Sequence, residues 1–193
     1  MKKKILVVLS LVTMFLFSGN LYAQESASRA GFQVGGYLPL GDWSDFVSAG
    51  IGGSVLYNYK LTSKIAFTAA AGYYNFPSKD ELGDVVGATG NWNYTVIPIL
   101  AGLKVGFGPS DQAFQPHIGL ELGFFLPSAE YEYRTETGVL TADPKPESVF
   151  GFAPSVGFDF RLGLDVDLIA SVKWNIAKKL NHLGINVGAM FRI

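Results

Sequence analysis

Residues 150–162 read FGFAPSVGFDFRL, and this stretch decides the fold. Large apolar residues occupy every second position, and small or charged residues occupy the positions between them. The first set is Phe150, Phe152, Pro154, Val156, Phe158, Phe160 and Leu162, and the second is Gly151, Ala153, Ser155, Gly157, Asp159 and Arg161. A period of two is typical of a β-strand with two unlike faces.

The same alternation recurs along the rest of the chain. It is regular in 116–126, 166–176 and 183–193, and weaker in 31–38, 51–61, 64–76 and 93–107. In the four regular segments every charged residue lies opposite the large apolar ones. A closed bacterial barrel needs an even number of strands. We therefore predict an all-β fold, an eight-stranded antiparallel up-and-down transmembrane β-barrel.

Two features favour lipid outside the barrel rather than a soluble barrel with an apolar interior. The small residues share the charged face, as the narrow interior of eight strands requires. Aromatic residues also gather near the predicted strand ends, where girdles meet the membrane interfaces. These aromatic residues are Tyr57, Tyr59, Tyr73, Tyr74, Phe76, Trp92, Tyr94, Phe107, Phe114, Trp174 and Phe191.

The charged face then lines the lumen. We predict a lumen charge network of Lys60, Lys104, Glu121, Asp159, Arg161, Asp167, Lys173 and Arg192. Buried charges are costly unless they are paired. Mixed signs in a narrow interior therefore favour a structural network, with a narrow or gated pore at most.

The connections alternate in length. Long or polar ones are 39–50, 77–92, 127–147 and 177–182, and short ones are 62–63, 108–113 and 163–165. Outer-membrane barrels place short turns in the periplasm and long loops outside, so both termini are predicted to be periplasmic. Within the predicted strands, Pro98 and Pro154 lack the N–H that a ladder needs, so we expect a β-bulge at each.

The N-terminus has the pattern of a secretory signal peptide. Lys2, Lys3 and Lys4 precede an apolar run, and a small-residue region ends at Ala23. The predicted domains are therefore a signal peptide, 1–23, and an outer-membrane barrel, 24–193. Removing 1–23 leaves 12 basic and 16 acidic residues, a net charge of −4. A negative charge gives no support to nucleic-acid binding.

Composition agrees with an exported barrel. Hydrophobic residues make up 49% of the chain and aromatic residues 14%, but charged residues only 16%. No cysteine is present, which excludes disulfides, thiolate zinc sites and lipoprotein processing. No later segment is long and apolar enough for a transmembrane helix.

The last eight residues, NVGAMFRI, resemble the C-terminal assembly signal of outer-membrane barrels. Asn186, Gly188, Phe191 and Ile193 fill its polar, glycine and two hydrophobic positions, with Ile193 in place of the frequent phenylalanine. This resemblance implies the barrel-assembly machinery and periplasmic chaperones as partners during biogenesis.

The whole mature chain resembles the small outer-membrane β-barrel family, the porin-like and OmpA/OmpX-like eight-stranded barrels. The matching stretches are 35–43, 96–104 and 114–123. The resemblance implies a Gram-negative cell-envelope protein in contact with outer-membrane lipid and lipopolysaccharide. The chain stops at the last predicted strand, so no peptidoglycan-binding domain is expected.

Residues able to carry catalysis are few. The two histidines, His117 and His182, are each followed by a glycine two positions later, so the His-x-Ser motif of lipid-modifying barrel deacylases is absent. The acidic groups at 80–84 and 143–147 lack ordered calcium-ligand spacing. We therefore predict no enzymatic activity, no cofactor and no metal site.

The function expected from these observations is a structural or surface-interaction role through the extracellular loops 77–92 and 127–147, with an extracellular partner that the sequence does not name. The alternative is a narrow porin-like channel for small solutes. A third alternative is a lipid-modifying barrel enzyme.

Overall fold

The computed structural model describes residues 28–79, 92–108, 112–135, 138–142, 147–163 and 165–193. The predicted signal peptide lies outside this part. The strands are β1 (Ser28–Pro39), β2 (Gly50–Lys60), β3 (Ile65–Pro77), β4 (Trp92–Gly106), β5 (Phe114–Thr135), β6 (Gly138–Ala142), β7 (Val149–Arg161), β8 (Val166–Ala177) and β9 (His182–Arg192). A short 3-10 helix, η1 (Gly41–Asp45), follows β1.

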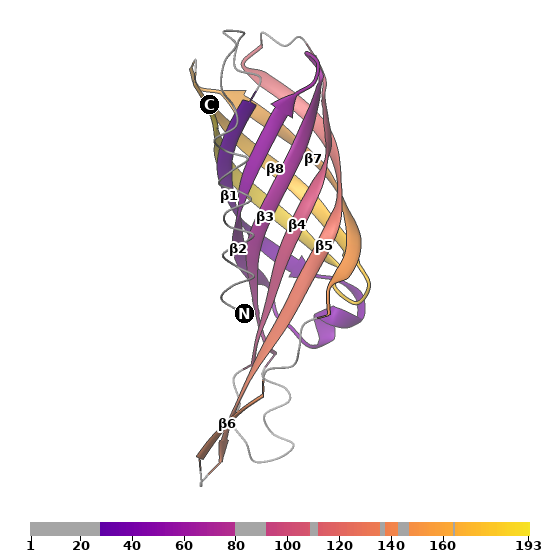
Figure 1. The fold of residues 1–193 in the computed structure, drawn as a ribbon, viewed down its shortest axis with the longest axis vertical. Coiled ribbons are helices and arrows are strands. Elements are labelled where there is room, and N and C mark those ends of the chain that lie inside the picture. Colours follow the sequence, from indigo (N-terminus) through magenta and orange to yellow (C-terminus); the bar gives the residue numbers. More distant parts are fainter. Residues whose placement is uncertain (1–27, 80–91, 109–111, 136–137, 143–146, 164) are drawn as a thin grey trace.

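All nine strands form one antiparallel sheet that closes on itself (Figure 1). β1 pairs with β9, β4 pairs with β5, and the other neighbours pair in chain order. β6 pairs only with the distal part of β5. The closed barrel therefore has eight strands, and the predicted fold class is confirmed.

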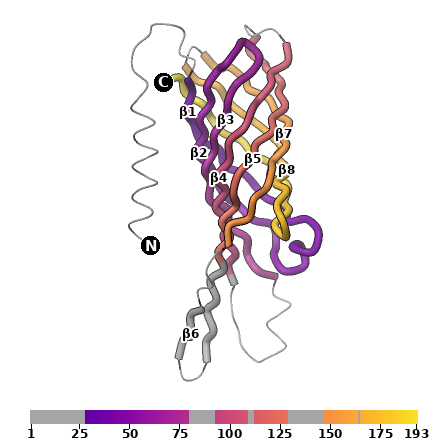
Figure 2. Tube along the Cα trace, turned by 45° about the vertical axis from the view of Figure 1, so that its right-hand side comes forward, coloured from indigo at the N-terminus to yellow at the C-terminus, as the bar shows by residue number. Residues whose placement is uncertain are grey.

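The two ends of the barrel differ. At the terminus end, β1 begins, β9 ends and tight connections join β2 to β3 and β7 to β8. At the opposite loop end, the β1–β2 connection carries η1, and β5 and β6 form a hairpin. Figure 2 shows the β1–β2 connection at the end away from the C-terminus.

The two faces of the strands are those predicted from the alternation. Along β7, Phe150, Val156 and Phe158 on the outer surface are 60%, 58% and 41% exposed. Their neighbours Ala153 and Asp159 point inward and are buried. Every predicted lumen charge lies on the inner face of its strand, and each of the eight barrel strands exposes large apolar side chains on the outside.

The expectation of bulges at Pro98 and Pro154 is wrong. In the β3–β4 ladder, Pro98 and Ile97 are unpaired opposite Gly72 and Tyr73, and the register is the same on both sides of this gap. The β7–β8 register is likewise unchanged across Pro154. Each proline interrupts one ladder only, since it still pairs with β5 on its other side. The missing N–H therefore costs a local gap and no inserted residue.

The expected long loop 127–147 is partly a strand pair. β5 continues to Thr135 and pairs with β6 from Tyr131 onward. The extension of β5 agrees with the sequence, in which Tyr131 and Tyr133 alternate with Glu130 and Glu132, but β6 was not predicted. Within the described ranges, no helix is long and apolar enough to cross a membrane.

Candidate functional site

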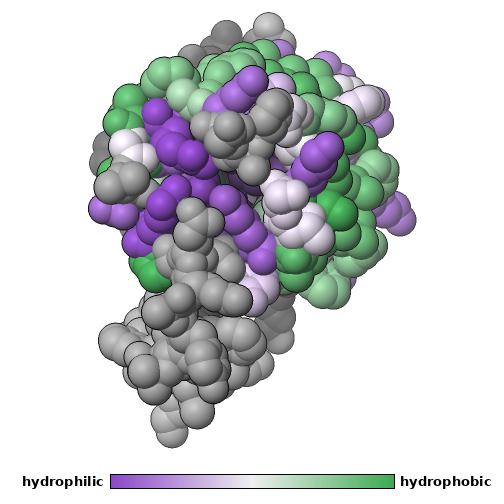
Figure 3. Space-filling model, turned by 90° about the horizontal axis from the view of Figure 1, so that it is seen from above, coloured by the Kyte–Doolittle hydropathy of each residue, from purple (hydrophilic) through white to green (hydrophobic). Residues whose placement is uncertain are grey.

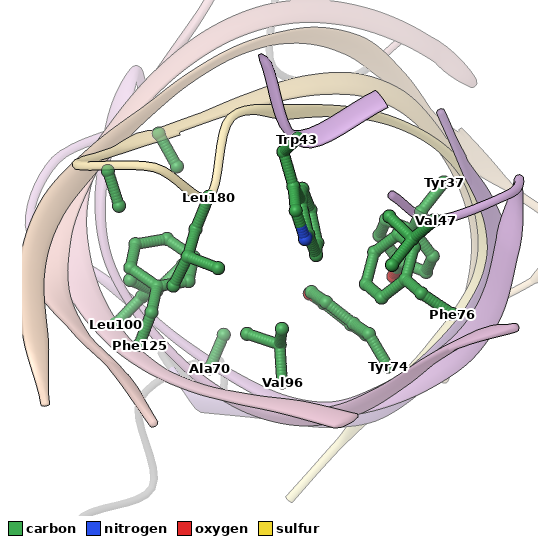
Figure 4. Packing of buried hydrophobic residues seen from close by; sticks show 12 residues of the cluster. Tyr37, Trp43, Val47, Ala70, Tyr74, Phe76, Val96, Leu100, Phe125 and Leu180 are labelled. Atoms are coloured by element: carbon green, nitrogen blue, oxygen red, sulfur yellow. The ribbon is translucent and has the colours of Figure 1, made fainter. Parts of the chain in front are cut away.

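The interior of the barrel is divided between an aromatic plug near the loop end and a charged region near the terminus end. We define the plug as the buried interior side chains that close the barrel below η1 (Figure 4). Its members are Tyr37, Trp43, Val47, Tyr74, Phe76, Val96, Leu100, Phe125, Leu180 and His182.

Trp43 enters the barrel from η1 because the β1–β2 connection folds back over the mouth. The Leu40 N–H donates to the Asn181 carbonyl (2.8 Å), and the Ser48 N–H donates to the Pro77 carbonyl (2.8 Å). Val47 also forms a β-bridge with Ser78. These bonds tie the connection to β3 and to the β8–β9 turn, so the indole ring is held inside.

The plug is packed as a stack of rings. The Tyr37 and Tyr74 ring centroids lie 3.9 Å apart. The Tyr37 hydroxyl donates to Asn186 Oδ1 (2.8 Å), and the Tyr74 and Ser54 hydroxyls are 3.2 Å apart. Gly184 is needed for this packing, because a Cβ there would lie 2.7 Å from the Tyr37 ring. Polar ends of the tyrosines are therefore satisfied while their rings fill the lumen.

His182 lies at the centre of the plug with no exposed surface. Its ring is within 5.8 Å, between centroids, of the rings of Tyr37, Trp43, Tyr74 and Phe76. Its Nδ1 is 2.8 Å from the Leu180 carbonyl oxygen. The sequence suggested a loop residue here, and the structure instead places His182 at the first position of β9, facing inward.

Four of the predicted lumen charges form two close ion pairs, each between strands that have one strand between them. Lys173 Nζ lies 2.5 Å from Glu121 Oε2, and both side chains are buried. Lys104 Nζ lies 2.7 Å from Asp159 Oδ2. Each anion therefore has a cation within hydrogen-bond distance, as a low-dielectric interior requires.

A second cluster lies nearer the terminus end. Asp167 pairs with Arg29 and lies 4.0 Å from Arg161 Nε. Arg192 is directly opposite Arg29 in the β1–β9 ladder. Lys60 lines a cavity at the same end. Sequence reasoning missed Arg29, although it shares a face with Gly31 and Gly35 and so lies on the small-residue side of its strand.

His117 is also part of this region. Its Nδ1 lies 3.4 Å from Asp159 Oδ1, inside the lumen. The described residues contain no group of three histidine, aspartate or glutamate side chains arranged to hold a metal ion. Neither histidine faces the outer surface of the barrel.

Among the described residues, three hollows adjoin the plug and the charged region. A pocket of about 810 Å³ lies outside the plug, between η1, the ends of β3 and β4, and the β8–β9 turn. A cavity of about 50 Å³ lies beside Glu121 and Lys173. Another of about 50 Å³ lies beside Arg29 at the terminus end. The plug occupies the interior between the large pocket and the two small cavities.

Three of the aromatic residues expected in girdles belong to the interior. Tyr74 and Phe76 are buried in the plug, and Tyr94 packs against Trp43 with ring centroids 5.8 Å apart. The signal was present in the sequence, since Tyr74 and Phe76 share the face of Ala70 and Gly72. Tyr59, Tyr73, Phe107, Phe114, Trp174 and Phe191 lie on the exterior, each more than 40% exposed.

The residues of the C-terminal motif divide between the two faces of β9. Asn186 and Gly188 point inward, and a Cβ on Gly188 would lie 2.1 Å from the Phe32 carbonyl oxygen. Phe191 and Ile193 lie outside, 41% and 57% exposed. Phe191 packs against Phe32 of β1, with ring centroids 6.4 Å apart, so the motif lies at the seam that closes the barrel.

No protein-family profile and no curated protein sequence matches the chain. Solved structures do. Neisserial surface protein A (NspA) is 13% identical, with a TM-score of 0.55 over 87% of this chain and 98% of that chain. Ail, the attachment invasion locus protein of Yersinia pestis, was solved with the heparin analogue sucrose octasulfate; it is 11% identical, with a TM-score of 0.55 over 86% of this chain and 99% of that chain.

A major outer membrane protein from Thermus thermophilus is similar to the same extent. It is 9% identical, with a TM-score of 0.57 over 86% of this chain and 100% of that chain. At such low identity the similarity establishes the fold alone. The alignment with each of these three structures covers nearly the whole of the other chain.

Proposed function

We propose that this chain, which has the fold of the small eight-stranded outer-membrane β-barrels, is an integral protein of the Gram-negative outer membrane with a closed lumen. It acts structurally or as a surface-interaction protein through its loop end, chiefly through segments 77–92 and 127–147. Residues 1–23 are a cleaved signal peptide, and both termini are periplasmic.

The exterior of the barrel supports the membrane assignment. Large apolar side chains on neighbouring strands are about half exposed, for example Phe32, Val55, Ile118 and Val187 at 52%, 61%, 48% and 57%. Soluble proteins rarely expose apolar patches larger than about a few hundred Å². The charged groups of the inner face, in contrast, are mostly buried, and Arg29, Lys104 and Lys173 form ion pairs with Asp167, Asp159 and Glu121. Hydrocarbon chains are the solvent that fits such an exterior.

The plug is the observation that carries the closed-lumen proposal. Trp43, Tyr37, Tyr74 and Phe76 are each at most 7% exposed, and Figure 4 shows all four side chains pointing into the lumen. Eight-stranded barrels have interiors just wide enough for side chains. We infer that these rings block a continuous water path between the large pocket and the charged region.

The loop end supports an interaction role. The pocket of about 810 Å³ has apolar and polar residues at its rim, among them Phe46, Asn93 and Lys179. Phe46 lies in the β1–β2 connection, away from the barrel wall, and its apolar side chain is 60% exposed. A protein with this fold is named for attachment and invasion and binds a heparin analogue. This similarity in fold supports a surface-binding role for the loop end.

A narrow porin-like channel is the second candidate. The charged region and its two small cavities favour it, because polar side chains line that half of the lumen. Conduction then requires the plug to move. The third candidate, a lipid-modifying enzyme, draws no support from the histidines, since His117 and His182 both face the lumen and not the lipid.

Single-channel recording in planar bilayers tests the closed lumen. Refolded mature protein is expected to insert without reproducible current steps, and detergent alone serves as the blank. Reproducible steps from the wild-type protein would reject the closed lumen and support the porin. A separate assay, binding of purified lipopolysaccharide to the protein in nanodiscs, tests the surface role and does not depend on the state of the lumen.

Biogenesis supplies the remaining part of the proposal. Asn186, Gly188, Phe191 and Ile193 are proposed to be recognised by the barrel-assembly machinery. Their place in β9, at the closing seam with β1, supports this, because the last strand must pair before the barrel shuts.

A further inference from the structure

A histidine lies at the centre of the plug. His182 has no exposed surface, and five aromatic rings surround its ring, with centroids between 5.4 Å and 6.1 Å away. These rings belong to Tyr37, Trp43, Tyr74, Phe76 and Phe125. Histidine is the side chain that in water changes its charge between about pH 5 and 8. A group able to gain a charge therefore lies where the lumen is closed.

The hydrogen bond of His182 decides which ring nitrogen takes up a proton. Nδ1 is 2.8 Å from the Leu180 carbonyl oxygen, which can only accept, so Nδ1 carries the hydrogen of the neutral ring. Nε2 is buried without a hydrogen-bond partner among the described residues. A second proton on the ring therefore creates an N–H at Nε2 that no side chain satisfies, together with a full positive charge.

The side chains that pack on His182 are neutral. The hydroxyls of Tyr37 and Tyr74 are engaged with Asn186 and Ser54. Asn175, the partner of His182 in the β8–β9 ladder, contributes an uncharged amide. Among the described residues, no carboxylate forms an ion pair with His182. A charge on the imidazole is therefore not balanced inside the plug.

The charged residues of the neighbouring elements lie in water or are already paired. Those of η1 and of the β8–β9 turn are exposed: Asp42, Asp45, Lys178 and Lys179. Along β8 the nearest inward charge is Lys173, which donates to Glu121 Oε2 at 2.5 Å. Aromatic rings attract a cation over their faces. The hydration that a fully buried, unpaired ion loses is worth more than this attraction. The closed plug therefore favours the neutral ring.

The turn that carries His182 also holds the lid of the plug. The carbonyl of Asn181 accepts from the Leu40 N–H (2.8 Å), and its Oδ1 accepts from the Ala177 N–H (3.1 Å). Leu40 directly precedes η1, which carries Trp43 into the lumen. Movement of His182 toward water therefore loosens the same contacts that keep Trp43 inside.

Polar space lies on both sides of the plug. The pocket of about 810 Å³ reaches Trp43 from the loop end, and a cavity of about 50 Å³ lies beside Lys173 and Glu121 on the other side. Figure 3 views the terminus end and shows hydrophilic side chains gathered at the centre inside a rim of hydrophobic ones. Opening would also give water to Asn175, whose two amide atoms are buried without a partner, and this lowers the cost of opening.

We propose that the protein is an acid-gated channel, in which protonation of His182 releases Trp43 and its neighbouring rings from the lumen and lets small ions pass. The inference rests on the closed lumen of the proposed function, which then describes the protein at neutral pH. A ligand shifts an equilibrium toward the state that it binds better. For the proton this is the open state, because there the charged imidazole of His182 reaches water.

Currents of the refolded mature protein in planar bilayers test the gate, recorded at about pH 7.5 and about pH 4.5, on either side of the usual histidine range. The wild type is expected to be silent at the higher pH and to give reproducible steps at the lower. The mean current should rise about tenfold or more, the usual size of such a coupling. Silence at both pH values would overturn the gate and leave the closed lumen in place. Steps already present at the higher pH would instead reject the closed lumen, and the gate with it.

A variant of His182 separates its proton from the other groups that acid titrates. His182→Gln keeps a donor for the Leu180 carbonyl but gains no charge, so its current should be the same at both pH values, whatever its level. The matched control, His117→Gln, removes the histidine of the charged region and should keep the wild-type response. Both variants retain the lumen carboxylates Glu121 and Asp159, which acid also protonates. A His182→Gln protein that still opens on acidification would overturn the role of His182.

A second measurement depends neither on conduction nor on a variant at position 182. In a protein that keeps Trp43 and has phenylalanine in place of the other tryptophans, acrylamide in the water is expected to quench the fluorescence several-fold more at the lower pH. The matched control keeps Trp174, which lies on the exterior and should respond equally at both pH values. Equal quenching of Trp43 at both pH values would show that the plug stays closed, against the proposal.

Discussion

The ring of Trp43 lies 4.5 Å from the ring of Phe76, measured between centroids, with the planes tilted by 58°. Trp43 reaches this position from a 3-10 helix outside the barrel wall, and Phe76 reaches it from the end of β3. The contact joins a connection to the barrel inside the lumen. If the lumen is closed as proposed, the behaviour of these rings decides whether the protein conducts.

Removing part of the plug should open the barrel. The combination Trp43→Ala, Tyr74→Ala and Phe76→Ala deletes three rings from the lumen and is expected to give reproducible current steps in planar bilayers. The control, Tyr73→Ala, Trp174→Ala and Phe191→Ala, deletes three exterior rings and should remain silent. Circular dichroism tests whether both variants form β-structure. Both should also stay folded in detergent until they are heated. A silent plug variant would show that something else closes the lumen.

Neighbouring residues of β7 should respond differently to arginine. Val156 is 58% exposed on the exterior, so Val156→Arg places a charge in hydrocarbon and should cost about 2–4 kcal/mol of folding free energy. Ser155 faces the lumen, and Ser155→Arg should instead disturb the ion pair of Lys173 with Glu121. Urea titrations of both variants, refolded into lipid vesicles whose bilayers differ in thickness, distinguish the two effects. Only the Val156 variant should depend on the bilayer, and identical behaviour would contradict the assignment of faces.

The buried pair of Lys173 and Glu121 should show strong coupling. Lys173→Met leaves a buried carboxylate without its cation and should cost about 3–5 kcal/mol. The double variant Lys173→Met with Glu121→Leu removes both charges and should cost much less than the sum of the single changes. Unfolding free energies of the four proteins in lipid vesicles give the coupling. Additive losses would mean that the 2.5 Å contact contributes nothing to stability.

The absence of cysteine makes orientation easy to test. Lys178→Cys puts a thiol at the loop end, and Gly163→Cys puts one at the terminus end, both at exposed positions. A membrane-impermeant maleimide added to intact cells is expected to label the first and not the second, while lysed cells label both. Labelling of Gly163→Cys alone on intact cells would reverse the proposed topology.

Much of this architecture follows from the sequence because a period of two is a local property. Every strand of the barrel was predicted, and the parity of Gly151, Ser155 and Asp159 identified the inner face. Inward glycines such as Gly102 are dictated by space, since a Cβ there would lie 2.0 Å from the Leu120 carbonyl oxygen. Such constraints are visible in sequence as small residues on one face.

The plug could not be predicted in the same way. The position of Trp43 depends on hydrogen bonds from Leu40 to Asn181 and from Ser48 to Pro77, which join distant parts of the chain. A five-residue 3-10 segment has no periodic signal of its own. The parity of Tyr74 and Phe76 did place them inside, but their position near a strand end favoured a girdle. Tertiary contacts therefore decide the placement of Tyr74 and Phe76, which the local sequence pattern leaves ambiguous.

Quenching of tryptophan fluorescence by brominated phospholipids tests the central claim most directly, namely that the bulky face meets lipid and the plug does not. Two single-tryptophan variants are needed, one keeping Trp174, which is 47% exposed on the exterior, and one keeping Trp43, which is 7% exposed inside. The other tryptophans are replaced by phenylalanine. Bromine on the acyl chains is predicted to quench Trp174 strongly and to leave Trp43 bright. Strong quenching of Trp43 with Trp174 unaffected, or no quenching of either, would contradict the account.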